Sequence, residues 1–424
     1  MKASNILRAK RAPVSILAAL SCFSFLHASA VAQEVPGQTL DSLIEIARKL
    51  SPDVAARTLD AAAAQARVEQ ADSLPDPTIT LNSDEIDRTG GPRQGKLYYG
   101  FSQEIPLWGK RTLRRDIARA EFNRDRATIK ESEAELTERV SAVFADYYQA
   151  SQAIALLDEL HRASHDIAAQ ARMQYAQGLG EQKDVYKAEV DTAAVAQERN
   201  KFETMRSRAM GLLNILLNRP ARAALAVPNA LPPVPPAETL EIGALVERAL
   251  KGNPSILAAQ AATTGAASER ELARKNWYPD LTLSAYGIDR GENGPPGYSA
   301  SISFKVPLEW GMHEAEESAA SAKLGASRAR EDAALRQIQE NLIEAASALE
   351  GARREETILR QQVLPNAEAS FTSARTAYAV NRASLTAVLT AQHDLAHAQL
   401  DLLAIQVDER RQLAVIERLI GGRL

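Results

Sequence analysis

Cysteine is nearly absent from this sequence. Cys22 is the only one among 424 residues, and it lies in an N-terminal stretch with the pattern of a cleaved secretory signal. A chain that begins after this stretch has no cysteine at all. The sequence therefore excludes disulfide bonds, thiolate metal sites and cysteine nucleophiles as the basis of its function.

Residues 1–32 have the three parts of a secretory signal peptide. Four lysines and arginines precede an apolar run at 14–26, and small residues at 28–32 offer two A-x-A cleavage sites. The run is shorter than the roughly 20 apolar residues of a membrane-spanning helix. The alternative is lipoprotein processing at Cys22, although the preceding Ala19-Leu20-Ser21 matches that signal poorly.

The sequence also lacks long apolar segments and a surplus of positive charge. After residue 32 no apolar segment is long enough for a membrane-spanning helix, so insertion into a membrane would require a barrel of strands. The signal contains four of the 50 lysines and arginines, which leaves 46 against 54 acidic residues and a formal charge of −8. This balance argues against a nucleic-acid partner, because such proteins usually carry a basic face.

Motifs of common enzymes are absent as well. The sequence has no phosphate-binding glycine loop followed by lysine, no G-x-S-x-G and no H-E-x-x-H. We therefore expect no cofactor and no enzymatic activity. If the protein takes part in transport, a partner has to supply the energy.

The residues after the signal repeat one plan twice, with an offset of about 200 residues. The expected domains are a first repeat at 33–227, a proline-rich linker at 228–238 and a second repeat at 239–424. Five landmarks recur in the same order: Thr39-Leu40 and Thr239-Leu240, Ser51-Pro52 and Asn253-Pro254, Pro75-Asp76 and Pro279-Asp280, Ile105-Pro106-Leu107 and Val306-Pro307-Leu308, Tyr175-Ala176 and Tyr378-Ala379.

Very long helices are expected in both repeats, at 107–217 and 311–420. Residues 110–177 contain neither glycine nor proline, and a helix of this length spans about 100 Å. Helices this long are typical of coiled-coil rods. The first rod is expected to reverse at Gly178-Leu179-Gly180, and the second to be interrupted at Pro365 and to reverse near residues 381–384. The helices should therefore fold back as antiparallel pairs.

Two predicted β-hairpins, at 77–105 and 279–306, precede these helices. Tyr298, Ala300, Ile302, Phe304 and Val306 share one face of a strand, while serines and Lys305 occupy the other. Four such strands of about nine residues fit the length of tilted transmembrane strands. A soluble sheet with one solvated face shows the same alternation.

Secretion and the long rods favour the membrane interpretation of these strands. Four strands cannot close a barrel, because single-chain barrels have about eight or more. Other copies of the chain should therefore pair with the edges. Trp108 and Trp310, at the strand ends, either form part of an interfacial aromatic belt or pack at the strand-to-helix turn.

This plan of helix, hairpin and long coiled-coil helices resembles the TolC family of outer-membrane factors over essentially the whole chain after the signal. The stretch FSQEIPLWGKR at 101–111 is similar to the CzcC-type branch, which serves heavy-metal resistance-nodulation-division (RND) pumps. The resemblance implies a mixed, mostly α fold in a Gram-negative outer membrane. Three chains would form a 12-stranded barrel and a periplasmic tunnel of 12 helices.

The resemblance also implies partners at the helical tips. A periplasmic membrane-fusion adaptor, joined to an inner-membrane RND transporter, would dock at Gly178, Leu179, Gly180, Asn381, Arg382, Ala383 and Ser384. The sequence departs from the family in one respect. TolC-type channels often carry two aspartates after the second tip, where this chain has Ala387 and Thr390, so an aspartate gate is in doubt. Asp184, Asp394 and Asp401 are the acidic residues nearby.

Two histidine pairs have the i,i+4 spacing that can bind zinc on one helix face: His161 with His165, and His393 with His397. Both pairs are at similar distances from their tips. They could equally be interhelical or solvated histidines, and the sequence supplies no third and fourth ligand. The sequence therefore assigns no metal site, and weak metal contact with these four residues stays a hypothesis.

Three functions remain. The leading one is an exit duct for divalent heavy-metal cations. The second has the same architecture but carries drugs or secreted polypeptides, and the third is a periplasmic coiled-coil scaffold without a pore. Amphipathic strands with aromatic ends favour a pore, whereas the cargo is not encoded in any motif of the chain.

Overall fold

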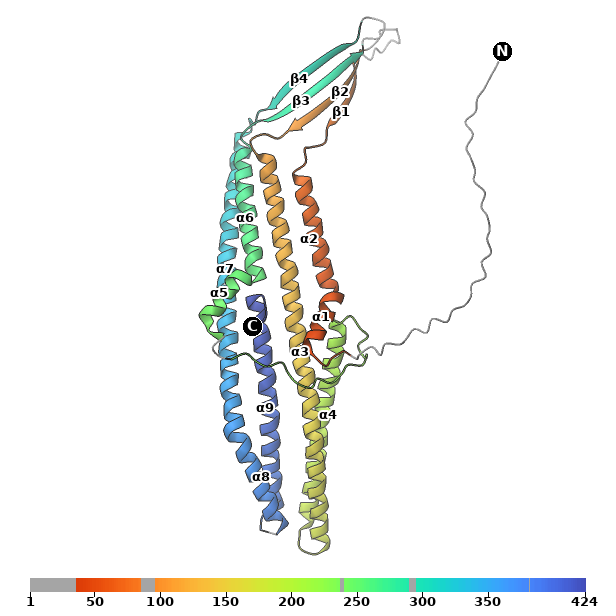
Figure 1. Ribbon diagram of the computed structural model, residues 1–424, viewed down its shortest axis with the longest axis vertical. Coiled ribbons are helices and arrows are strands. Elements are labelled where there is room, and N and C mark those ends of the chain that lie inside the picture. The colour runs from red at the N-terminus through yellow and green to blue at the C-terminus, as the bar shows by residue number, and fades with distance from the viewer. Residues whose placement is uncertain (1–35, 85–95, 237–239, 290–294, 381) are drawn as a thin grey trace, which may run out of the picture. The chain divides into compact units, whose positions relative to one another are not determined.

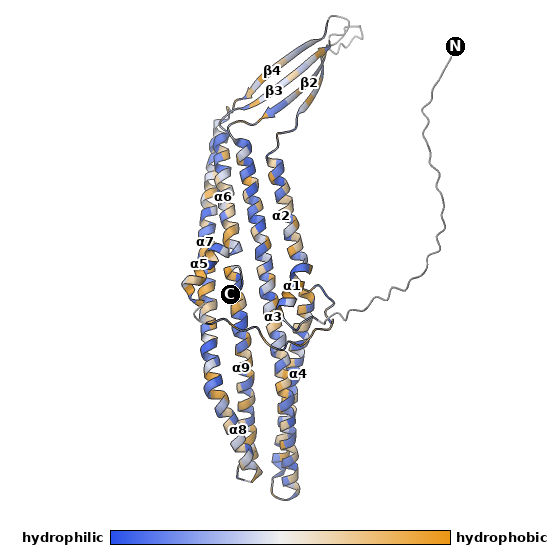
Figure 2. Cartoon of the chain, viewed as in Figure 1, coloured by the Kyte–Doolittle hydropathy of each residue, from blue (hydrophilic) through white to orange (hydrophobic). Residues whose placement is uncertain are grey.

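The computed structural model describes residues 36–84, 96–236, 240–289, 295–380 and 382–424. The predicted signal peptide, with Cys22, lies outside these residues, as do most of both hairpin loops and Asn381. Within the described part, none of the helices has the length and apolar character of a transmembrane span. Figure 2 shows hydrophilic and hydrophobic residues interspersed along the long helices.

The same order of elements occurs twice along the chain (Figure 1). The first series is α1 (Leu40–Leu50), α2 (Pro52–Ala71), β1 (Thr78–Asp84), β2 (Lys96–Ile105), α3 (Lys110–Ala176) and α4 (Gln182–Leu216). The second is α5 (Ile242–Gly252), α6 (Pro254–Lys275), β3 (Asp280–Asp289), β4 (Gly297–Lys305), α7 (Trp310–Ile358), the π-helical turn η3 (Leu359–Val363), α8 (Leu364–Ala379) and α9 (Leu385–Ile420). The long helices and four strands expected from the sequence are present.

Equivalent residues start the second helix of each series. Ser51 caps α2 by accepting a hydrogen bond from the Val54 N–H at 3.4 Å, and Asn253 caps α6 in the same way from Ile256 at 3.1 Å. A proline follows each cap, where its missing N–H costs nothing. The side chain of Asn253 also donates to the carbonyl of Leu419 at 2.8 Å, which joins the start of α6 to the end of α9.

The second rod contains a π-helical turn instead of the expected break at Pro365. α-Helical geometry ends at Ile358, the turn spans Leu359–Val363, and α8 already includes Pro365 near its start. Proline has no N–H to donate, and its ring crowds the carbonyl four residues earlier. The wider π turn accommodates this misfit, so the helical path continues through the proline.

The four strands form one antiparallel sheet in the order β1-β2-β3-β4. Ile79 lies opposite Phe101 in the first hairpin, and Leu283 lies opposite Ile302 in the second. The two hairpins meet at β2 and β3, where Phe101 lies opposite Ala285. One edge of β1 and one edge of β4 are therefore left without a strand partner in the described chain.

Buried apolar side chains form two equivalent cores beside the middle of the rods. The first includes Leu43, Val140 and Leu213 from α1, α3 and α4. The second is built in the same way by Leu245, Leu342 and Ile416 from α5, α7 and α9. Burial of each such side chain contributes about 1.5–3 kcal/mol. A third cluster lies near the hairpin turns and includes Ile167, Ala188, Tyr378 and Val388.

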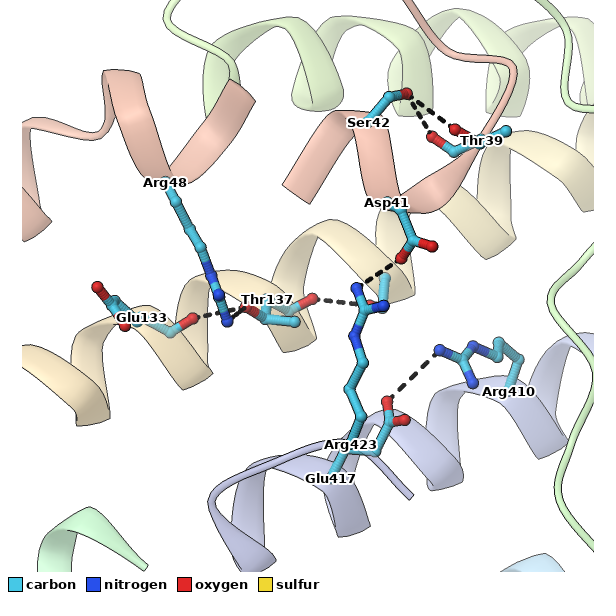
Figure 3. A network of polar contacts seen from close by, with 10 residues as sticks. Thr39, Asp41, Ser42, Arg48, Glu133, Thr137, Arg410, Glu417 and Arg423 are labelled. Atoms are coloured by element: carbon cyan, nitrogen blue, oxygen red, sulfur yellow. Dashed lines mark hydrogen bonds and ion pairs between the residues drawn. The ribbon is translucent and has the colours of Figure 1, made fainter. Parts of the chain in front are cut away.

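An ion pair joins the first series of elements to the C-terminal end of the chain, and further polar contacts lie beside it (Figure 3). Arg423 pairs with Asp41 of α1 at 2.5 Å, while Arg48 donates to the hydroxyl of Thr137 on α3 at 3.1 Å. The Arg423–Asp41 pair is mostly exposed, so water and salt weaken it. Arg410 is buried and pairs with Glu417 at 3.4 Å; burial lowers the pKa of its guanidinium.

Candidate functional site

The sheet has one strongly apolar face. The strand registers place alternate residues of all four strands on this face, and those on β1, β2 and β4 are largely exposed. The exposed fraction reaches 76% for Ile79 and 81% for Tyr298. An apolar surface of this kind needs an apolar environment or a partner. The large exposed side chains on it are Ile79, Leu81, Leu97, Tyr99, Phe101, Leu283, Tyr298, Ile302 and Phe304.

The opposite face is mostly hydroxyl-bearing and charged. It carries Thr78, Thr80, Asn82, Tyr98, Ser102, Glu104, Thr282, Ser284, Tyr286, Ser299, Ser301, Ser303 and Lys305. A sheet that is apolar on one side and polar on the other separates a lipid-like phase from water. Transmembrane strands that line an aqueous lumen have this alternation.

Two glycines allow tyrosine rings to lie across the centre of the sheet. Gly100 is directly opposite Tyr286, and Gly287 is directly opposite Tyr99. A Cβ atom at Gly100 would lie 2.0 Å from the Tyr286 ring, and one at Gly287 would lie 2.3 Å from the Tyr99 ring. Each ring therefore fills the place that a side chain would take on its own face, which fixes the β2–β3 register.

The end of β2 is tied to the start of β3 at a strand-to-helix junction. Asp280 accepts a hydrogen bond from the Leu107 N–H at 3.1 Å and pairs with the buried ammonium of Lys110 at 2.8 Å. Lys110 also donates to the carbonyl of Tyr278 at 2.8 Å. Trp108 has a positive φ of 60°, and its indole N–H donates to the carbonyl of Pro279 at 2.9 Å.

Trp108 and Trp310, the predicted interface residues, have different surroundings. The ring of Trp108 packs on Tyr278 with 5.2 Å between centroids and is 52% exposed. Trp310 is the first residue of α7 and is 67% exposed. Trp108 therefore packs at the strand-to-helix turn, as one of the two interpretations expected. Both rings are also exposed enough to reach a membrane surface.

The helical hairpins reverse at the predicted tip residues. Gly178 has a φ of 72°, and the N–H groups of Leu179 and Gly180 both donate to the carbonyl of Gln174. Leu179 is 63% exposed. A left-handed glycine after the last helical turn satisfies carbonyls that the helix leaves open. This geometry presents an apolar side chain at the tip of the α3–α4 hairpin.

The second tip joins α8 to α9 through residues 380–384. Asn381 lies outside the described residues. The Arg382 N–H donates to the carbonyl of Ala377 at 2.8 Å, and the hydroxyl of Ser384 caps α9 by accepting from Ala387 at 3.3 Å. Ala383 packs partly against the cluster near the turns.

A buried polar cluster behind the tips connects three helices. Asp191 of α4 accepts a hydrogen bond from the hydroxyl of Ser164 on α3 at 3.1 Å and contacts the Nε2 atom of His393 on α9 at 2.6 Å. Gln392 of α9 donates to the Ser164 hydroxyl at 2.8 Å. Sequence patterns gave no signal for Ser164, Asp191 and Gln392, because only the packing of the rods brings them together.

The two histidine pairs lie on different helices, α3 and α9. His393 and His397 stack on α9 with 6.4 Å between ring centroids, and His393 is engaged by Asp191. His161 and His165 lie on α3, and the Nδ1 atom of His161 is buried without a hydrogen-bond partner. Across the described ranges, no three or more His, Cys, Asp or Glu side chains gather as metal ligands.

Near the second tip, the described residues of a single chain form no ring of acidic side chains. Ala387 and Thr390, at the positions of the family's gate aspartates, are exposed, as are Asp394 and Asp401, whereas Asp184 is partly buried.

A pair of neighbouring glutamates between two helices was not expected from the sequence. Glu409 of α9 is buried and hydrogen-bonds to Glu356 of α7, three residues before the π turn begins. Burial and the nearby Glu356 carboxylate raise the pKa of Glu409 to about 7. Burial also acts to raise the pKa of Glu356, but hydrogen bonds from Gln406 and Arg360 outweigh it and lower that pKa. Near neutral pH, Glu409 is therefore partly protonated beside an ionised Glu356.

The chain matches a family model described as outer membrane efflux protein over residues 43–218 and 245–422. It is 24% identical over 392 residues to the cobalt-zinc-cadmium resistance protein CzcC of Cupriavidus metallidurans, and the match covers 90% of each chain. It is also 24% identical over 300 residues to the nickel and cobalt resistance protein CnrC of that organism, covering 69% of this chain and 68% of CnrC.

Among solved structures, the fold is similar to that of CusC, whose structures are described in terms of transmembrane channel formation. The TM-score is 0.79 at 16% identity, with 92% of this chain and 93% of CusC covered. The chain belongs to the outer membrane efflux protein family. Its predicted fold class and the resemblance to CzcC are both confirmed, and family and fold are those of channel proteins.

Proposed function

We propose that three copies of this member of the outer membrane efflux protein family form a passive exit duct for divalent heavy-metal cations. The observation that supports this most is the amphipathic sheet, which has one strand edge free at each side. The apolar face suits lipid, the polar face suits an aqueous lumen, and the free edges require further copies to close the barrel.

The cargo is proposed from the relatives. CzcC and CnrC are named for resistance to cobalt, zinc, cadmium and nickel, and the first aligns with this chain over 90% of its length. A net negative charge after the predicted signal suits a cationic cargo. Within one chain, the described residues hold no metal-binding cluster, so the duct would conduct cations rather than store them.

The proposed partners follow from the two helical tips. A periplasmic membrane-fusion adaptor would dock at Gly178-Leu179-Gly180 and at residues 381–384, and an inner-membrane RND transporter would supply the energy. The exposed Leu179 offers an apolar contact at the first tip. Trp108 and Trp310 would lie where the barrel meets the periplasm, as members of an interfacial belt.

The test is growth of a strain that lacks the gene, across graded zinc, cobalt, cadmium, nickel and copper, with dyes and bile salts in parallel. Selective loss of metal tolerance, restored by the gene, is expected. Loss of dye and bile-salt tolerance with metal tolerance intact would leave the duct but overturn the cargo. Extraction from outer membranes without detergent, as a monomer, would instead favour a scaffold without a pore.

A further inference from the structure

The second rod is one residue longer than the first between its core and its tip. Val140 and Leu342 occupy equivalent places in the two cores, at an offset of 202, whereas Tyr175 and Tyr378 near the tips differ by 203. The π-helical turn Leu359–Val363 lies within this interval. Its wider i→i+5 bonding takes up one extra residue without ending the helix, and such turns often mark functional positions. The turn is therefore a joint between two α-helical parts of the second rod.

A pair of glutamates joins α7 to α9 immediately before this joint. Glu356 accepts hydrogen bonds from Gln406 of α9 at 2.9 Å and from Arg360 at 2.7 Å. Glu409, one helical turn after Gln406, is 5% exposed and hydrogen-bonds to Glu356. An ionised carboxylate is only an acceptor, so two carboxyls hydrogen-bond to each other only while one of them is protonated. This contact between the helices is therefore made by protonated Glu409.

The linker between the two repeats passes beside the same pair. A cavity of about 590 Å³ lies between the linker and the helices, and its walls include Glu356, Glu409 and Pro235. The guanidinium of Arg353 on α7 donates a hydrogen bond to the Pro235 carbonyl, which ties the linker to the second rod. A polar cavity of this size holds water. Water can therefore reach the otherwise buried Glu409 and carry its proton.

The charges that face Glu409 come from α7. Burial and the Glu356 carboxylate raise the pKa of Glu409, whereas the guanidinium groups of Arg353 and Arg360 lower it. Arg360 is paired with Glu356 at 2.7 Å, while Arg353 is bound to a neutral carbonyl of the linker. A carboxylate is a stronger acceptor than a carbonyl. An ionised Glu409 therefore draws Arg353 away from the linker.

The other elements around the pair bring no further charge toward Glu409 within the described chain. Tyr148 of α3 borders the cavity, and the linker borders it with alanine, leucine, valine and proline. On α9, Arg410 pairs with Glu417 at 3.4 Å, and Asp408 is a direct sequence neighbour, which does not share a helix face with Glu409. An ionised Glu409 therefore depends on α7 for its compensating charge.

We propose that Glu356 and Glu409 form a proton-operated lock at the joint of the second rod. With Glu409 protonated, the pair holds α7 on α9, and Arg353 holds the linker on α7. When Glu409 ionises, its charge repels Glu356 and attracts Arg353, so the linker is released and the π turn and the start of α8 open. The part of the rod that leads to the tip therefore moves more freely above about pH 7 than below it. The lock is a property of one chain, goes beyond the proposed duct and does not depend on its cargo.

Hydrogen exchange of the backbone amides at residues 356–366, in the full-length chain in detergent, tests the lock. Protection is compared at pH 6 and pH 8 after correction for the intrinsic pH dependence of exchange. In the open state Glu409 titrates at its ordinary pKa of 4.5, and in the locked state at about 7. Linkage then predicts that wild-type protection at the joint falls about tenfold between these two pH values.

Two controls separate the lock from a general effect of pH. Glu409→Gln keeps the hydrogen bond to Glu356 without a titrating proton, so its protection at the joint should be the same at both pH values. The first rod has Ile154 and Arg206 at the places equivalent to the two glutamates. The amides at 152–162 should therefore be unaffected in both proteins.

Wild-type protection at 356–366 that is equal at both pH values refutes the lock. A fall of the same size in Glu409→Gln, or at 152–162, refutes it as well, because another group or the whole chain then titrates. If Glu409→Gln does not fold, Glu356→Gln replaces it: it removes the neighbouring charge and should reduce the tenfold fall to less than about threefold. None of these results bears on the proposed duct, which is judged separately by the metal tolerance of the strain.

Discussion

The two strand-to-helix junctions have nearly the same sequence, but only the first is closed by contacts within the chain. At the first, Lys110 and the Leu107 N–H both reach Asp280, so the turn is closed within the chain. The second has one extra residue, Glu309, after which Met312 stands in place of Lys110. Asp76, the equivalent of Asp280, precedes β1 at the far edge of the sheet. The two junctions therefore share a backbone plan, but within the described chain only the first contains a buried ion pair.

The two rods differ in a similar way. α3 runs for 67 residues without a change of helical type, whereas α7 passes through a π turn into α8. The carboxyls of Glu356 and Glu409 lie beside that turn. The second rod therefore combines a local change of helical geometry with a group that titrates near neutral pH, and the described part of the first rod shows no such combination.

The largest effect is expected from making the first junction resemble the second. Lys110→Met removes the cation that pairs with Asp280 at a site where the lysine side chain is only 4% exposed. Removing one partner of a buried ion pair costs about 3–5 kcal/mol. We expect a loss of this size in the free energy of unfolding, measured in detergent by urea titration of the helical circular-dichroism signal.

The control is the double variant Lys110→Met with Asp280→Asn, which removes both charges. It should recover part of the loss, because no buried carboxylate is then left without its cation. Met312→Lys, the reverse exchange at the second junction, should not destabilise the chain by more than about 0.5 kcal/mol, since Met312 is exposed. Equal losses for Lys110→Met and Met312→Lys would refute the difference between the junctions.

The next effect concerns the acid pair of the second rod. The pKa of Glu409 is raised in the folded protein from 4.5 to about 7, so its stabilising contribution is complete below pH 4.5. It is lost as the pH rises through 7, because the folded state then loses the proton that the unfolded state has already lost. A shift of this size corresponds to about 3 kcal/mol.

Glu409→Gln is the matched variant, because an amide keeps the hydrogen bond to Glu356 without a titrating proton. The wild-type chain should lose stability between pH 5 and 8 relative to this variant, as followed by thermal unfolding at each pH. Parallel profiles for the two proteins would show that Glu409 has an ordinary pKa.

Local sequence patterns predicted the long helices and the strands, whereas contacts between helices could not be predicted from the sequence. The lack of glycine and proline from 110 to 177 and the alternation at 298–306 identified the long helices and the strands, since these patterns depend only on local periodicity. Asp191, Lys110 and Glu409 were missed, because their roles depend on which helix lies opposite. Pro365 predicted a break in the helix. Whether a π turn of five residues can replace such a break is decided by packing against other helices, which the sequence does not show.

The smallest effect is expected at the first tip, where only the backbone conformation is at stake. Gly178 has a φ of 72°, and a Cβ there would meet no atom within 4 Å, so Gly178→Ala should cost about 1–2 kcal/mol from the left-handed conformation alone. Gly325→Ala, in the interior of α7 with equally open surroundings, should instead stabilise by about 0.5–1 kcal/mol. Hydrogen exchange of the amides at 175–181 should rise in the first variant and stay unchanged in the second. A loss of equal size in both variants would mean that space around the glycines, rather than the positive φ at the tip, decides their role.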